Sequence, residues 1–241
     1  MKDTCVIISG ATGGIGKELS QKCISSNDVQ KCILLYKDES KFKDCFSESI
    51  TNKIHSQYYN MEKDFYVELA LLDGKYTNIR LVLNAFTIQP IERIESLDMK
   101  DVVKNININI LSQINLINSV LKEVKRLNLN LSVINLNSGA AYKPLKAWSL
   151  YSGAKAYINM YLKTLLEEEN IQVVSYDPGV VNTPMQKVIR DTDINIFEQA
   201  EIFRNYHKNN MLNTPQQVAE DIFSKYILDW KALNFEERFS R

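Results

Sequence analysis

The stretch "IISGATGGIGKEL", residues 7–19, places Gly10, Gly14 and Gly16 directly after an apolar run and at the start of a helical pattern. Glycines at such a turn let the backbone approach a pyrophosphate closely, and the amides that open the following helix face its negative charge. A strand before the glycines and a helix after them are the context that this kind of site requires. The stretch therefore predicts a dinucleotide-binding α/β fold rather than an ordinary strand-to-helix turn.

The rest of the chain continues this alternation of strands and helices. Short runs rich in Val, Ile, Leu and Tyr alternate with longer stretches of helical period, which is typical of βαβ units with a parallel sheet. We expect strands at residues 4–9, 31–36, 54–59, 79–84, 131–137 and 171–176, and a short seventh near residue 233. We expect helices over about 14–26, 101–127 and 149–169, and a capped one from residue 214. The pattern predicts a single-domain Rossmann fold over residues 1–241, with a doubly wound parallel sheet of about seven strands and helices on both faces.

Residues 184–213 depart from the pattern, because they are polar and irregular in period. In a doubly wound sheet, an insertion beyond the carboxyl end of a strand lies where a substrate lid would sit. We therefore predict a lid in this segment.

Composition argues against several classes of function. The chain of 241 residues has 29 basic and 29 acidic side chains, and this balance gives no electrostatic reason to expect nucleic acid or an anionic membrane as a partner. No apolar run has the length of a signal peptide or a membrane span, and the four cysteines match no zinc or redox motif. Neither histidine has a metal-ligand neighbour, and no G-x-S-x-G elbow occurs. We expect a cytoplasmic protein that acts on a small molecule without a metal.

A tyrosine with a lysine four residues later is the strongest candidate for chemistry. The spacing occurs in three pairs, Tyr59 with Lys63, Tyr142 with Lys146, and Tyr151 with Lys155. Tyr59 straddles a strand end and Pro144 interrupts the second pair, so the third pair alone shares a helix face. A nearby cation favours the ionised form of a phenol, which makes proton exchange near neutral pH easier. Ser138 lies thirteen positions before Tyr151, at the end of an expected strand.

Ser138, Tyr151 and Lys155, together with the glycine loop, resemble the short-chain dehydrogenase/reductase family over nearly the whole chain. The resemblance implies that Tyr151 donates a proton, that Lys155 lowers its pKa and binds the nicotinamide ribose, and that Ser138 hydrogen-bonds the substrate oxygen. It also implies an Asn on the long helix. Asn109 fits best, because Ser112 then replaces the family's glycine, whereas Asn105 and Asn107 are interpreted as helix surface.

The resemblance also implies a set of cofactor contacts. They are Gly10, Thr12, Gly14, Ile15, Gly16, Lys37, Asn60, Asn84, Ala85, Tyr151, Lys155, Pro178, Gly179, Val181 and Thr183. Asn60 replaces an Asp that commonly holds the adenine ring, and Phe86 replaces the glycine of the "N-A-G" element. Tyr36 stands where NAD-preferring members usually have Asp, and Lys37 where NADP-preferring members often have Arg. This favours NADP(H), although a shift of one residue would bring Asp38 to the ribose.

Two further stretches, "NSGAAYKPLKAWSLYSGAK" and "DPGVVNTPMQKVIR", are similar to the sepiapterin reductase and benzil reductase branch. The resemblance implies an NADPH-dependent reductase of a ketone or a vicinal dicarbonyl in a bulky or aromatic compound. Trp148, Tyr142 and Met185 are candidates for the substrate pocket, although aromatic residues at helical spacing serve as core equally often. Glu236 or Glu237 stands where pterin-reducing relatives carry an acidic anchor, and a charged tail explains the same residues.

Three expectations stay open at this point. A reductase of sugars or acyl ketones would have the same catalytic residues with a more polar pocket. A non-catalytic NADP(H)-binding sensor or scaffold would have the same fold. Homodimerisation through the helices at about 101–127 and 149–169 is implied by the family resemblance.

Overall fold

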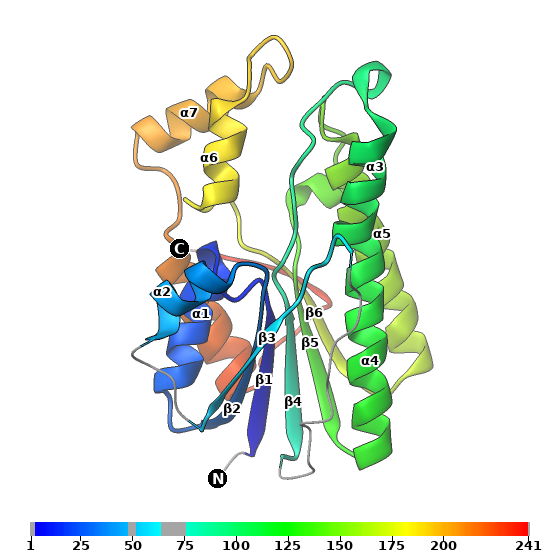
Figure 1. Ribbon diagram of the computed structural model, residues 1–241, viewed down its shortest axis with the longest axis vertical. Coiled ribbons are helices and arrows are strands. Elements are labelled where there is room, and N and C mark those ends of the chain that lie inside the picture. The colour runs from blue at the N-terminus through cyan, green and yellow to red at the C-terminus, as the bar shows by residue number, and fades with distance from the viewer. Residues whose placement is uncertain (1–2, 48–51, 64–75, 241) are drawn as a thin grey trace.

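The computed structural model describes residues 3–47, 52–63 and 76–240, and its centre is one parallel sheet. The sheet has seven strands in the order β3-β2-β1-β4-β5-β6-β7, and every neighbouring pair is parallel (Figure 1). The strands are β1 (Thr4–Ser9), β2 (Val29–Tyr36), β3 (Ile54–Tyr58), β4 (Asn78–Leu83), β5 (Asn130–Leu136), β6 (Gln172–Asp177) and β7 (Glu236–Arg238). The strand order reverses between β1 and β4, and this switch point opens a crevice at the carboxyl ends of the strands. The Rossmann-like sheet is confirmed, and its last strand begins at residue 236 instead of near 233.

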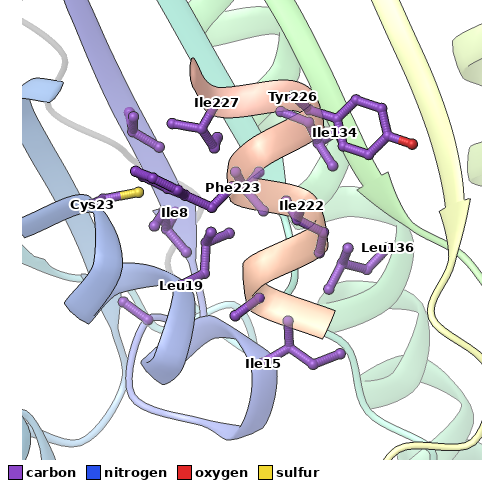
Figure 2. Close-up of a cluster of buried hydrophobic side chains, with 14 of the residues drawn as sticks. Ile8, Ile15, Leu19, Cys23, Ile134, Leu136, Ile222, Phe223, Tyr226 and Ile227 are labelled. Atoms are coloured by element: carbon purple, nitrogen blue, oxygen red, sulfur yellow. The ribbon is translucent and has the colours of Figure 1, made fainter. Parts of the chain in front are cut away.

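Helices cover both faces of the sheet, which explains why the residues of its central strands are almost all buried. On one face lie α1 (Gly14–Ser25), α2 (Glu39–Phe46) and α8 (Pro215–Ile222); on the other lie α4 (Ser112–Leu127) and α5 (Ser149–Glu168) (Figure 1). Figure 2 shows the first face, where Leu19 and Phe223 pack near Ile8 of β1. Burying each such side chain contributes roughly 1.5–3 kcal/mol. Among the described residues, no helix is long and apolar enough to cross a membrane.

The long helix predicted over 101–127 contains a local irregularity. It begins as α3 (Met99–Ile106), with the Asp98 side chain as its cap, passes through a π-helical turn, η3 (Asn107–Leu111), and continues as α4. Turns of this kind are rare and occur frequently at functional sites. The helix ends at Asn128, whose left-handed backbone, with φ of 53°, is a common way to end a helix.

The expected capped helix after residue 214 is present. In α8 the Thr214 hydroxyl accepts a hydrogen bond from the Gln217 amide, and the Gln217 side chain accepts one from the Thr214 amide. This capping box satisfies two of the helix's otherwise unpaired donors. The helix then continues into a π-helical turn, η5 (Phe223–Leu228).

The segment 184–213 forms two short helices, α6 (Pro184–Asp191) and α7 (Ala200–Lys208), that stand beyond the carboxyl ends of the strands (Figure 1). Arg204 of α7 ties them together, because its guanidinium donates to the carbonyl oxygens of Arg190 and Thr192. The segment starts and ends at one place, where Val181 and Asn213 form an isolated parallel bridge.

Candidate active site

The glycine loop between β1 and α1 forms a turn that larger residues would disturb. Gly10 and Gly14 have φ of +65° and +47°, in the left-handed region that side chains disfavour. A Cβ atom on Gly14 would lie 2.9 Å from Cγ2 of Thr183, and one on Gly16 would collide with the Asn84 side chain and the Gly10 carbonyl. The loop therefore brings the start of α1 close to the ends of β4 and β6.

Asn84, at the end of β4, fastens this loop to the sheet. Its Nδ2 donates to the carbonyl oxygens of Ser9, at 3.1 Å, and Gly10, at 3.0 Å. The hydroxyl of Ser9 in turn accepts from the amides of Asn84 and Ala85, at 3.1 Å each. These four bonds hold the glycine turn in one position relative to the switch point.

A cavity of about 510 Å³ opens above this loop. The predicted cofactor contacts that line it are Gly10, Thr12, Gly14, Ile15, Lys37, Asn84, Ala85, Tyr151, Lys155, Pro178 and Thr183. One end exposes the start of α1, whose first turn has no acidic residue, so its free amides suit a pyrophosphate. The glycine-lined floor leaves room that Cβ atoms would fill, and the cavity therefore fits a dinucleotide.

Four of the predicted cofactor contacts lie outside the lining of this cavity. Gly16 instead allows close packing of α1 against Asn84. The side-chain oxygen of Asn60 accepts from the Glu62 amide at 3.1 Å, within a turn after β3. Gly179 and Val181 line an adjoining cavity.

The far end of the first cavity is rich in lysine. Lys37 forms an ion pair with Glu62, and Nζ of Lys104 lies 3.5 Å from the same carboxylate. The two ammonium groups hold the pKa of Glu62 below its usual range. Lys41 lines the same cavity, so its lining contains three lysines near Glu62 in addition to Lys155. The Asp38 carboxylate, by contrast, caps α2 by accepting from the Lys41 amide at 3.0 Å.

Tyr151, Lys155 and Ser138 meet where β5 ends and α5 begins. Tyr151 and Lys155 lie one turn apart on α5 and are 7% and 3% exposed, and Tyr151 is hydrogen-bonded to Ser138. Lys155 donates to the carbonyl oxygen of Leu136 at the end of β5. Its Nζ atom lies 5.8 Å from the centroid of the Tyr151 ring and 3.5 Å from that of Phe86.

Burial sets the protonation of this pair. It raises the pKa of Tyr151 to about 12, with the Ser138 hydrogen bond opposing the change and Asp177 adding to it. Burial also lowers the pKa of Lys155 to about 7, against the charge of Asp177. The phenol therefore stays protonated at neutral pH, ready to donate, while the lysine is close to its midpoint. The family resemblance implies that Lys155 lowers the pKa of Tyr151. Burial has the larger effect here and raises that pKa.

The asparagines of the long helix form hydrogen bonds to the backbone of neighbouring segments. Asn109, buried in the π-helical turn, accepts from the Thr87 amide at 2.8 Å and donates to the Thr87 carbonyl oxygen at 2.9 Å. This fastens the segment after β4 to the helix, and Asn109 lines neither cavity, so its catalytic role stays a prediction. Asn105 is buried and donates to the Gln89 carbonyl oxygen at 2.7 Å, so its interpretation as helix surface was wrong. Asn107 is partly buried and donates to the Glu62 carbonyl oxygen at 3.2 Å.

A second cavity, of about 600 Å³, adjoins the first and is largely apolar. The predicted substrate residues Tyr142, Trp148 and Met185 all line it, beside Ser138 and Tyr151. The Trp148 ring stacks on those of Phe197 and Phe203, with centroids 5.1 and 5.9 Å apart. The lining residues that sequence analysis missed include Leu145, Asp177, Gln186, Ile189 and Phe203. Phe203 had no visible signal, because it lies in the irregular 184–213 segment.

Charged side chains of both signs line the second cavity, and the two candidate glutamates there have different partners. Tyr142 is 51% exposed, and its hydroxyl accepts from the side-chain amide of Asn159 at 2.9 Å. Glu236 contacts the same network, and its carboxylate helps to raise the pKa of Tyr142. Glu237 is committed elsewhere, because it accepts from the Tyr226 hydroxyl and the Leu233 amide. Glu236 has partners as well, because it pairs with Nζ of Lys163 at 2.8 Å and accepts from Asn159 at 3.3 Å.

Comparisons with known proteins agree with this geometry. The family model described as short chain dehydrogenase matches residues 4–194. The chain is 28% identical to a benzil reductase ((S)-benzoin forming) of Bacillus cereus over 229 residues, which cover 90% of this chain and 91% of that protein. It is 27% identical to the sepiapterin reductase of Rattus norvegicus over 212 residues, 78% of each chain. The crystal structure of the KRED1-Pglu enzyme has the same fold, with a TM-score of 0.85 at 24% identity over 97% of this chain and 99% of that one. The chain thus belongs to the short-chain dehydrogenase/reductase family, whose members are oxidoreductases that use nicotinamide cofactors.

Proposed function

We propose that this protein is an NADPH-dependent reductase of ketones or vicinal dicarbonyl compounds. The observation that carries the proposal is that Tyr151 lines both cavities, the glycine-floored one and the aromatic one. A protonated phenol at that junction reaches a carbonyl oxygen in the second cavity while a dinucleotide occupies the first.

Each residue of the junction then has a role. The bound nicotinamide supplies the hydride. Tyr151 gives its proton to the substrate oxygen, and its raised pKa keeps that proton in place until the oxygen becomes basic. Ser138 orients the phenol through their hydrogen bond and offers the same hydroxyl to the substrate. The Lys155 ammonium, one helical turn away, stabilises the phenolate that remains.

Preference for NADP(H) over NAD(H) is supported by the lysine-rich end of the first cavity. Lys37, Lys41 and Lys104 line this cavity, and the carboxylate of Glu62 pairs with Lys37 and Lys104, so an added phosphate would meet an excess of positive charge. The alternative contact, Asp38 to a ribose hydroxyl, is disfavoured because the carboxylate caps α2.

A bulky, largely apolar substrate is supported by the second cavity. Trp148, Phe203 and Met185 give it aromatic and apolar walls, and Ser138 and Tyr151 provide polar groups at one end. The similarity to benzil reductases is consistent with an aromatic 1,2-diketone. A reductase of sugars would need a pocket whose surface is more polar than that of this largely apolar cavity.

The test follows NADPH absorbance with benzil, other 1,2-diketones, sepiapterin, simple ketones and sugars. We expect turnover to be fastest with the aromatic diketones and to fall about 10²-fold or more in Tyr151→Phe, with NADPH binding kept. Tyr161→Phe is the matched control, because Tyr161 lies on the same helix and its hydroxyl donates to Asn118. Binding of NADPH without oxidation by any compound would instead indicate a sensor or scaffold, and a preference for sugars would indicate another class of reductase.

We also infer that the protein forms a homodimer through its long helices. Val103, Leu111, Tyr157 and Met160 of the α3 to α5 region are between 44% and 64% exposed despite being apolar. We expect sedimentation to show a dimer that Met160→Glu dissociates, whereas Leu233→Glu, at an apolar residue that is 90% exposed elsewhere, should leave the mass unchanged. A monomeric wild-type protein would contradict this inference.

A further inference from the structure

Phe86 is an aromatic residue where the family's "N-A-G" element has glycine. It follows Asn84 and Ala85 directly and lines the first cavity. Its ring centroid lies 3.5 Å from Nζ of Lys155, and the ring meets that of Tyr151 edge to face, with centroids 5.8 Å apart. One side chain therefore contacts both members of the proton-donating pair.

The Lys155 ammonium needs such a partner. It is 3% exposed, and within the described part of the chain its hydrogen bond goes to the Leu136 carbonyl oxygen and none of the salt bridges includes it. A buried ammonium that lacks partners tends to lose its proton, because desolvation disfavours the charged form. The negative face of an aromatic ring attracts a cation within about 6 Å of its centroid, most strongly when the pair is desolvated.

We propose that Phe86 is a positioning residue that holds the Lys155 ammonium in its charged form beside Tyr151, through the π face of its ring. The proposal rests on the proposed function and deepens it, because it explains how Lys155 stays charged in a buried position, as the reaction requires. The edge-to-face contact with Tyr151 also restrains the phenol ring.

Charged and titratable groups approach Lys155 from several elements. Tyr151 lies on the same helix, and Asp177 lies at the end of β6, where its charge raises the pKa of Lys155. Lys104 of α3 lines the same cavity from the far side. The ends of β4 and β5 contribute the neutral side chains of Asn84 and Ser138. The ring thus acts in the same direction as Asp177 and against burial, so its removal should lower the pKa.

The direct test measures the Lys155 pKa without any turnover. Lysine labelled with ¹³C at Cε is titrated by NMR, and Lys155→Met identifies the resonance. In Phe86→Leu, which keeps apolar bulk but removes the π face, we expect the pKa to fall by about one unit. Phe86→Tyr keeps the face and should titrate like the wild type.

Phe223→Leu is the matched control, because Lys22 lies over that ring, at 5.7 Å, on the α1 and α8 side of the sheet. It should leave the Lys155 titration unchanged. An unchanged pKa in Phe86→Leu, or an equal fall in Phe86→Tyr and Phe86→Leu, would overturn the proposal, because in either case the π face would not matter.

A kinetic readout links the pKa to the reaction. The alkaline limb of the pH profile of kcat/KM for benzil should move to lower pH in Phe86→Leu and stay in place in Phe86→Tyr. If no carbonyl compound is turned over while the NMR shift appears, the proposed function fails and the role of Phe86 stands. If turnover is normal and the NMR shift is absent, the proposed function stands and the proposed role of Phe86 fails.

Discussion

The two cavities that meet at Tyr151 are built in different ways. The floor of the first is built from backbone, that of the glycine turn and the strand ends, and the side-chain amide of Asn84 holds it in place. The second is shaped by side chains of residues far apart in the sequence, from Tyr142 to Phe203 and Glu236. Backbone shape tolerates few substitutions, whereas side chains on loops and short helices can change without disturbing the sheet. One half of the site is therefore fixed by the fold, and the other determines which substrate is accepted.

The largest effect is expected at the junction of the two cavities. Lys155→Met removes the buried cation and should lower kcat/KM for a diketone by about 10²–10³-fold, because a preorganised charge is lost. Lys146→Met tests the specificity of this effect, since Lys146 also follows a tyrosine by four residues but pairs with Glu198 at the surface. Similar losses of kcat/KM in both variants would mean that the effect does not depend on the position of Lys155 between the two cavities.

A smaller effect is expected in the backbone-built cavity. Gly14→Ala forces a side chain into a left-handed conformation and against Thr183, at a cost of about 1–2 kcal/mol. We expect NADPH binding, measured by calorimetry, to weaken about tenfold, which is what 1.4 kcal/mol corresponds to. Gly13→Ala should bind normally, because a Cβ atom there has no neighbour within 4 Å. Equal weakening would show that the loop's shape is not the cause.

In the side-chain-built cavity, Phe203→Leu should alter substrate binding alone. Loss of its stack on Trp148 removes an aromatic contact worth about 0.5–1.5 kcal/mol. We expect KM for benzil to rise several-fold while the dissociation constant of NADPH stays the same. A change in NADPH binding of similar size would contradict the division between the two cavities.

The smallest effect is expected at Lys37, which is largely exposed and paired with Glu62. Exposed ion pairs contribute about 0.2–1 kcal/mol, so Lys37→Ala should weaken NADPH binding by up to about fivefold and leave NADH binding unchanged. Lys43→Ala, which breaks an exposed pair with Glu39, should change neither. Equal losses for NADPH and NADH would mean that Lys37 does not recognise the extra phosphate.

The same division explains what could be predicted from the sequence. Local patterns predicted the strands, the glycine turn and the Tyr151 and Lys155 pair, because spacing along one helix or strand determines their geometry. Whether Asn105 is buried depends on the π-helical turn and on Gln89, which the local pattern does not reveal. The place of Phe203 depends on how α7 folds back over the strands, and the role of Asp38 depends on where α2 begins. Tertiary contacts decide such cases.

The bridge between Val181 and Asn213 has a consequence for protein engineering. Because α6 and α7 leave the scaffold and return to it at adjacent positions, the stretch between these two residues can be treated as an exchangeable cassette. Transplanting the corresponding stretch from a relative should change which substrates the protein accepts and leave the first cavity, which fits the dinucleotide, unchanged.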